Sequence, residues 1–262
     1  MVKMQLDIGC EWHPCPALVS AAASICHGDM FCIECVKPFR GRQFVHRDHR
    51  LACPICEKRK AKRYCPAKAE SICTVCCGTE REVTIDCPSD CSYLVESRKH
   101  DLGRREVDWK TMPFSDVQVS RSTVNRHEPL FTEFAYAICK YAGENPPVTD
   151  SDIIASLKSL AEAYQTLSSG IYYEKPPDYL LQRGLYEALQ AAIKNYKQAG
   201  SADPGFETPR DSEVRDVLIF LTQLGASRAN GRPKGRAYLD VLRSQFKSDE
   251  LQKSSPGLLV IP

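Results

Sequence analysis

Eight of the fourteen cysteines in this chain lie between residues 53 and 91. Two C-x2-C pairs, Cys53/Cys56 and Cys73/Cys76, have the spacing at which a two-residue turn brings both sulfurs into one coordination sphere. The same stretch also contains Cys65, Cys77, Cys87 and Cys91. Tetrahedral thiolate sites select zinc or an iron–sulfur cluster, and eight thiolates suffice for two such sites. The stretch therefore predicts metal binding, with zinc favoured over an iron–sulfur cluster.

A second group of cysteines and histidines lies in residues 1–50. The spacing favours one zinc ion bound by Cys10, Cys15, Cys32 and Cys35. Further candidate ligands in this region are Cys26, His27, His46 and His49. A solvent-exposed histidine pair in a basic loop explains the last two equally well. The run ICHGDMFCIEC imperfectly resembles the centre of a RING finger, since the histidine directly follows the first cysteine. Together the two regions predict two to four zinc ions.

The cysteine spacing between residues 53 and 91 resembles that of HIT and MYND zinc fingers, in which ligand pairs interleave. The resemblance rests on the opening C-x2-C pair, the eight residues before the next cysteine, and the later C-x2-C pair. It implies one ion bound by Cys53, Cys56, Cys73 and Cys76, and a second bound by Cys65, Cys77, Cys87 and Cys91. Cys77 substitutes for a family cysteine, because Lys68 occupies that position. The whole chain also resembles uncharacterised bacterial proteins that join such a module to a helical domain.

A different grouping needs no family resemblance. Cys73 and Cys76 can form a zinc knuckle, residues 82–85 alternate like a short strand, and Cys87 and Cys91 can open a helix near Ser89. Knuckle, hairpin and helix would make a treble clef with one zinc ion. Cys53 and Cys56 would then complete the upstream RING-like site. We favour the eight-ligand grouping because it leaves no thiol in this stretch without a role.

Basic residues are concentrated in residues 36–63, where ten lysines and arginines face only Asp48 and Glu57. Such a block can contact nucleic-acid phosphates or an acidic partner, or it can simply be solvated. Aromatic residues for base stacking are sparse there, which favours the solvated interpretation. The candidate nucleic-acid contacts are Arg40, Arg42, Arg47, Arg50, Lys58, Arg59, Lys60, Lys62 and Arg63.

The composition is that of an ordinary globular protein, with 43% apolar and 26% charged residues. No run of about 18 uncharged apolar residues is present, so we expect no membrane span. The N-terminal stretch has no apolar core typical of a secretory signal. We therefore expect a reducing, cytoplasmic location, where clustered cysteines bind metal rather than form disulfides.

From about residue 126 the chain changes character, and apolar residues recur at helical spacing in five segments separated by Gly or Pro. The sequence predicts an α-helical fold with small zinc-stabilised modules that contain short hairpins and a treble-clef-like helix. The expected divisions are a Cys/His finger at 1–50, an eight-cysteine module at 51–104, a linker at 105–125, a bundle of about five helices at 126–250, and a tail at 251–262. A strand is expected around Val117 and Val119 in the linker.

Two loops of the predicted bundle have residues suited to recognition. Tyr172 and Tyr173 precede a stiff Pro-Pro pair, and Arg228–Arg236 is a basic, glycine-containing turn that can hold an anion. Ordered helix connectors explain both loops without any binding role.

No metalloprotease, P-loop, serine-hydrolase or zinc-deaminase motif occurs in the chain. Four protein ligands around each ion also leave no open position for an activated water. We therefore expect a non-enzymatic zinc-binding adaptor that mediates protein–protein interaction, although enzymatic activity is left open. The alternatives are zinc-dependent nucleic-acid binding through residues 36–63, a RING-like ubiquitin-ligase module, and redox chemistry at the vicinal Cys76–Cys77 pair. Partner identity and oligomeric state have no signal in the sequence.

Overall fold

The computed structural model describes residues 52–104, 106–168, 170, 173–200 and 207–247. The chain divides into two units, residues 1–49 and 50–262. Several predicted site residues lie outside the described residues, and their roles stay predictions. These are Cys10, Cys15, Cys26, His27, Cys32, Cys35, Arg40, Arg42, His46, Arg47, His49 and Arg50.

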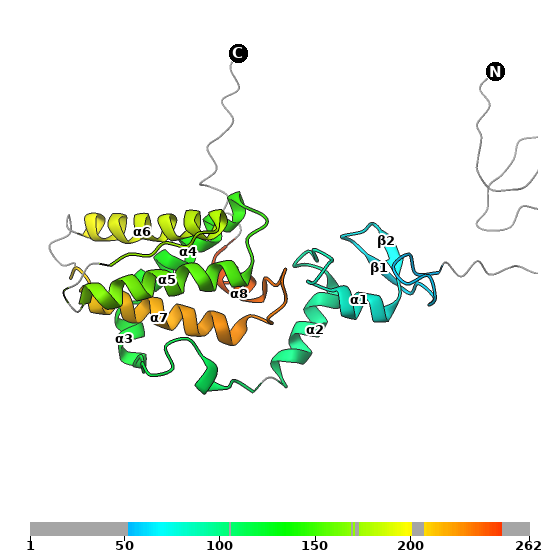
Figure 1. Ribbon diagram of the computed structural model, residues 1–262, viewed down its shortest axis with the longest axis horizontal. Helices are drawn as coiled ribbons and strands as arrows, with labels where there is room; N and C mark the ends of the chain where they lie inside the picture. The colour runs from blue at the N-terminus through cyan, green and yellow to red at the C-terminus, as the bar shows by residue number, and fades with distance from the viewer. Residues whose placement is uncertain (1–51, 105, 169, 171–172, 201–206, 248–262) are drawn as a thin grey trace, which may run out of the picture. The chain divides into compact units, whose positions relative to one another are not determined.

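Residues 52–103, here called the cysteine module, contain two short strands followed by two helices (Figure 1). Strands β1 (Arg63–Cys65) and β2 (Glu70–Ile72) form an antiparallel hairpin. Helix α1 (Thr74–Glu80) follows β2 directly, and helix α2 (Ser92–Leu102) comes after a loop. The module thus contains a short hairpin followed by helices, and its assignment as a zinc finger stays a prediction.

Two local predictions in the cysteine module are wrong. Residues 82–85 do not extend as a strand, because the Glu80 carbonyl accepts the amides of Val83, Thr84 and Ile85 and turns the chain around the end of α1. Helix α2 begins at Ser92 rather than near Ser89, because a turn closed by the Cys91 amide and the Pro88 carbonyl precedes it. Cys91 is therefore the N-cap residue of α2, and Cys87 lies before the helix.

The connector between the cysteine module and the bundle also differs from its prediction. Its only regular elements among the described residues are a 3-10 helix, η1 (Trp109–Thr111), and helix α3 (Arg121–Arg126). No strand forms at Val117 and Val119. These side chains pack against the core of the bundle, and Gln223 donates to the Phe114 carbonyl at 3.0 Å. Bundle contacts thus replace the strand pairing that the alternation suggested.

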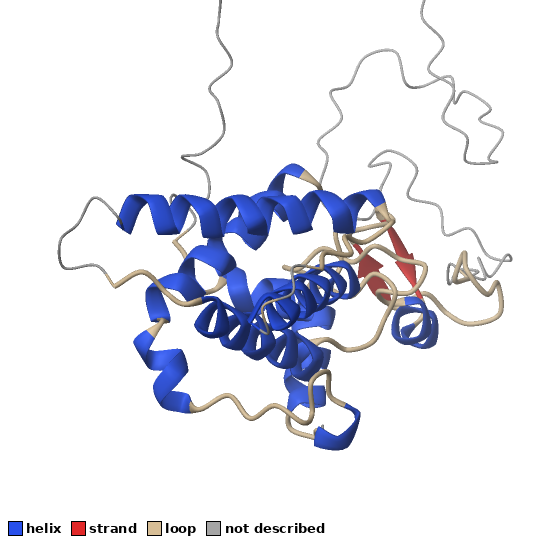
Figure 2. Ribbon diagram, turned by 60° about the vertical axis from the view of Figure 1, so that its left-hand side comes forward, coloured by secondary structure: helices blue, strands red, loops and turns tan. Residues whose placement is uncertain are grey.

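The five helices predicted after residue 126 are confirmed. They are α4 (Glu128–Glu144), α5 (Asp150–Ser168), α6 (Leu180–Gly200), α7 (Asp211–Arg228) and α8 (Ala237–Arg243). Together with α3 they form the helical domain, residues 121–247 (Figure 2). Helix α5 packs against α6 and α7, and the predicted apolar stripes meet in one buried core. This core includes Leu130, Phe134, Ile138, Ile153, Leu157, Leu160, Leu185, Leu189, Ile193, Val214, Val217 and Leu218.

Local residues explain the start of helix α5 and the packing near the end of helix α7. Asp152 accepts hydrogen bonds from both the amide of Thr149, at 3.0 Å, and its hydroxyl, at 2.7 Å, which is a capping interaction at the start of α5. Gly225 does not end α7, which continues to Arg228. A Cβ at Gly225 would lie 2.8 Å from a ring carbon of Tyr238, so this glycine permits close packing of α7 against α8.

Candidate metal centre

Four cysteine sulfurs meet at one point in the cysteine module. The sulfurs of Cys53, Cys56, Cys73 and Cys76 all lie within 4.8 Å of one another. A tetrahedral ion with metal–sulfur bonds of about 2.3 Å separates its sulfurs by about 3.8 Å. The Sγ atoms of Cys56 and Cys73 are 3.9 Å apart. The group that the interleaved pattern implied for its first ion is therefore assembled at ligand distance.

Each pair of thiols is positioned by a different local structure. The first pair sits on a turn in which Glu57 donates its amide to the Cys53 carbonyl at 2.7 Å and Cys53 donates to the Arg59 carbonyl at 2.8 Å. The second pair begins α1, where Cys73 is the N-cap residue and its Sγ accepts the Cys76 amide at 3.3 Å. The hairpin β1–β2 joins the two positions. The structural order is thus a cysteine-bearing turn, a hairpin and a cysteine-bearing helix start.

The surroundings of the four thiols favour some thiolates and oppose others. Backbone N–H groups of Lys58 and Arg59 lower the pKa of Cys56 to about 6. Burial opposes ionisation of Cys53, yet N–H groups of the surrounding backbone lower its pKa below the ordinary value. Burial, together with the neighbouring thiols, raises the pKa of Cys76 to about 12. Four adjacent thiolates therefore require a cation between them, since like charges at this separation oppose ionisation.

The other four cysteines of the module are arranged differently. Cys65 and Cys91 lie near enough to Cys87 that, together with burial as the larger cause, they raise the pKa of its thiol. Cys77 instead accepts hydrogen bonds from the guanidinium groups of Arg63 and Arg81, both at 3.7 Å. Within the described part of the chain, only the first quartet has its sulfurs within 4.8 Å of one another. The second quartet stays a prediction.

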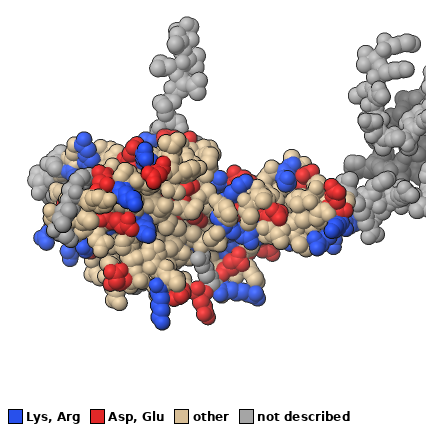
Figure 3. All heavy atoms as spheres, in the orientation of Figure 1, with Lys and Arg blue, Asp and Glu red and all other residues tan. Residues whose placement is uncertain are grey.

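The described part of the basic block lies next to the first cysteine pair. The side chains of Lys58, Arg59, Lys60 and Lys62 are exposed, and Tyr64, on strand β1, is 60% exposed. Figure 3 shows Lys and Arg side chains gathered at the end of the module where the described chain begins. Arg63 behaves differently, because its guanidinium lies 4.6 Å from the ring centroid of Tyr93 and also donates to a thiol.

The basic turn Arg228–Arg236 contacts groups of the chain itself. Arg232 donates to the carbonyls of Gly78, at 3.2 Å, and Arg81. Arg236 pairs with Asp86 at 2.5 Å. The carboxylate that pairs with this turn in the structure is thus supplied by the cysteine module. Of the two tyrosines in the other candidate loop, Tyr172 lies outside the described residues and Tyr173 is exposed.

Comparisons with known proteins give no match to any protein-family model, curated protein or solved structure. Among the described helices, none is long and apolar enough to cross a membrane. The four-cysteine geometry is therefore the observation on which a functional proposal rests.

Proposed function

We propose that this chain is a non-enzymatic zinc-binding adaptor in which a structural zinc ion holds the cysteine module in shape for protein–protein interaction. The observation that carries the proposal is the set of four sulfurs within 4.8 Å of one another at Cys53, Cys56, Cys73 and Cys76. All four tetrahedral positions are then taken by protein ligands, which is the arrangement of structural rather than catalytic zinc sites.

Zinc fits this site better than other divalent metals for two reasons. Thiolate donors exclude the hard cations magnesium and calcium, which take oxygen ligands. The order of turn, hairpin and helix start is also compatible with a treble-clef zinc finger, although the alternative grouping from the sequence placed such a finger one cysteine pair later. An all-cysteine site can also hold iron, so elemental identity is the first property to measure.

The adaptor role is supported by what the module leaves on its surface. Large apolar side chains at Tyr64, Val75, Val83 and Val95 are exposed. Aromatic residues such as Tyr64 are enriched at the centres of protein interfaces, where they fill pockets on the partner. A rigid module that carries such residues can present them without a large entropic cost on binding.

A second zinc ion, bound by Cys65, Cys77, Cys87 and Cys91, is a finer part of the proposal. The electrostatic influence of Cys65 and Cys91 on Cys87 supports their proximity. Binding would require Cys77 to exchange its guanidinium partners for the ion.

The test is the metal content of purified full-length protein and of two variants. Cys73→Ser removes a ligand of the first quartet. Cys139→Ala is the matched control, because Cys139 is buried in α4 within the helical core. We expect Cys73→Ser to lose about one zinc ion per chain and Cys139→Ala to keep all of its zinc. Equal zinc content in wild type and Cys73→Ser would contradict the proposal. A coloured protein that contains iron would also contradict it and would indicate a redox-active iron centre in place of structural zinc.

Nucleic-acid binding is a second candidate, because exposed Lys58, Arg59, Lys60 and Lys62 adjoin the exposed ring of Tyr64. Basic groups beside an aromatic ring suit single-stranded nucleic acid. The double variant Lys60→Ala/Lys62→Ala should then reduce the slope of log affinity against log salt by about 1.4, at roughly 0.7 per phosphate contact. A slope unchanged by the double variant would remove these two lysines from the interface.

A further inference from the structure

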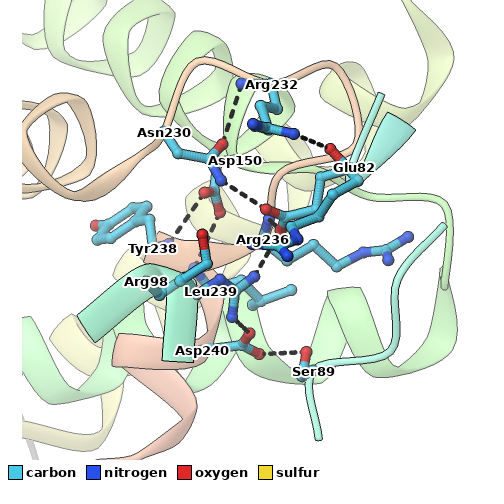
Figure 4. A network of polar contacts seen from close by, with 12 residues as sticks. Glu82, Ser89, Arg98, Asp150, Asn230, Arg232, Arg236, Tyr238, Leu239 and Asp240 are labelled. Carbon is cyan, nitrogen blue, oxygen red and sulfur yellow. Dashed lines mark hydrogen bonds and ion pairs between the residues drawn. The ribbon is translucent and has the colours of Figure 1, made fainter. Parts of the chain in front are cut away.

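Glu82 is the most deeply buried acidic side chain of the cysteine module among the described residues, with 1% of its surface exposed. It follows Arg81, the C-cap residue of α1, and has a positive φ of 53°, which is uncommon for a residue other than glycine. Such a conformation persists where surrounding contacts hold it. Figure 4 shows these contacts, which come from both the cysteine module and the helical domain.

The Glu82 carboxylate has partners in both parts of the chain. Arg98, on helix α2 of the module, donates to Oε1 at 2.7 Å. Asn230, in the loop after α7, donates its side-chain amide to Oε2 at 2.6 Å. A buried charge is tolerated only when its hydrogen-bonding partners are present. The carboxylate is therefore fully compensated only while the module and the helical domain are in contact.

The backbone around Glu82 is bound by the same loop. The Lys234 amide donates to the Glu82 carbonyl at 2.8 Å, and the Lys234 Nζ donates to the Thr84 carbonyl at 2.7 Å. Arg232 donates to carbonyls at the end of α1. Residues 230–236, here called the latch loop, thus close the C-terminal end of α1.

A second set of contacts connects helix α2 with helix α8. Asp240, in α8, accepts from Arg98 at 2.5 Å and from the Ser89 hydroxyl at 2.9 Å. Arg98 therefore bridges two carboxylates, one in each part of the chain. If either part is removed, this arginine loses one of its carboxylate partners and becomes exposed to solvent.

Helix α1 connects the latch loop to the four-cysteine site. It has seven residues, which is too short to be stable by itself. Its start carries Cys73 and Cys76, whereas its end is held by the latch loop. Metal and latch loop therefore hold opposite ends of one marginal helix, so loss of either weakens the structure that the other needs.

We propose that the latch loop docks the cysteine module on the helical domain only while metal occupies the four-cysteine site. Metal binding orders α1 and thereby presents Glu82 and the α1 carbonyls to the latch loop. Metal loss releases the module and uncovers Arg232, Lys234 and Arg236, so the metal-free chain presents a basic surface that the metal-bound chain covers. This inference rests on the proposed function, since it takes metal binding by the quartet as its first step.

The test is amide hydrogen exchange of the full chain with metal bound and after its removal by a chelator. The Lys234 amide is the direct reporter, because its acceptor is the Glu82 carbonyl. We expect metal removal to speed exchange in residues 230–236 by about tenfold or more, and to leave exchange in the middle of α5 unchanged. Unchanged exchange in the latch loop while residues 63–80 open would overturn the inference and leave metal binding intact. A chain that contains no metal before chelation would instead contradict the proposed function itself.

Two variants separate docking from metal binding. Asn230→Asp keeps the oxygen that accepts the Arg232 amide but replaces the donor to Glu82 with a second carboxylate. Glu82→Gln removes the buried charge from the module side. We expect each to speed exchange in the latch loop and to lower the affinity for zinc, while the number of zinc ions bound at saturating zinc stays at the wild-type level. Glu80→Gln is the matched control, because Glu80 accepts from Thr84 within the module, and we expect wild-type exchange from it. Wild-type protection of the latch loop in both test variants would contradict the proposal.

Discussion

The cysteine module and the helical domain differ in the kind of buried residues that stabilise each of them. The buried apolar cluster of the module is small, and four of its six fully buried members are cysteines. The helical domain buries a contiguous core contributed by helices α4 to α8. A module of about fifty residues with so small a cluster gains little stability from apolar burial, and domains of this size often use a metal or disulfides as well. We therefore expect the module to depend on a metal at its four-cysteine site, whereas apolar packing stabilises the helical domain.

Metal removal is expected to cause the largest difference in protease sensitivity between the two regions. Structural zinc supplies roughly 10–16 kcal/mol of folding free energy in small fingers, more than such a core can replace. Chelation should therefore make residues 52–103 sensitive to protease while the helical domain stays resistant, with most of the helical circular-dichroism signal retained. Equal protection of the module before and after chelation would contradict its dependence on metal.

A cavity in the helical core should destabilise the helical domain and leave metal binding by the cysteine module unchanged. Leu157 is 0% exposed in α5, so Leu157→Ala should lower the free energy of unfolding of the helical domain by about 2–5 kcal/mol. The measurement is denaturant unfolding combined with metal analysis. Leu180→Ala is the control, because Leu180 is 79% exposed and its truncation should have little effect. Loss of zinc in the Leu157 variant under native conditions would show that the two regions do not differ in this way.

The stability of the helical domain should depend on pH through the buried carboxyl group of Asp150. Burial raises the pKa of Asp150 to about 6, although the amides of Tyr238 and Leu239 lower it. Because the folded-state pKa lies above the ordinary value, the contribution of this group to stability is present below about pH 4 and lost as pH rises through 6. It is worth about 2–3 kcal/mol. An NMR titration of the Asp150 carboxyl tests the shift, and a midpoint near 4 would contradict it.

A glycine pair tests the packing of the helical domain on a finer scale. Gly225→Ala would place a Cβ 2.8 Å from the Tyr238 ring, so we expect a loss of about 1–3 kcal/mol. Gly143→Ala is the matched helical control, since a Cβ there meets nothing within 4 Å and should stabilise α4 by up to about 1 kcal/mol. Thermal unfolding of both variants measures the difference. A Gly225 variant as stable as wild type would show that α8 adjusts easily against α7.

Local sequence signals were sufficient for much of the fold. The stripes of the five helices depend on helical periodicity, and the cap at Thr149 and Asp152 depends on residues three positions apart, so both are visible without tertiary information. The proximity of Cys53, Cys56, Cys73 and Cys76 was also predictable, because each C-x2-C pair is a local unit. The interleaved grouping of all eight cysteines stays a prediction.

The two wrong predictions within the cysteine module arise from local turns, whereas the other misses arise from tertiary contacts. The alternation at Val117 and Val119 indicated a strand, but these residues pack on the helical domain instead. Glu82 carried no local signal, since its partner Asn230 is 148 positions away in the chain. The basic turn Arg228–Arg236 left open whether it holds an anion or is an ordered connector, and only the folded chain shows which groups of the chain it contacts.

The number of zinc ions lost when Cys53, Cys56, Cys73 and Cys76 are all replaced by serine tests the central claim most directly. The full-length variant should bind about one zinc ion fewer per chain than wild type, and residues 52–103 should become protease-sensitive. A variant that keeps the full zinc content and the wild-type protease resistance would contradict metal binding at this site.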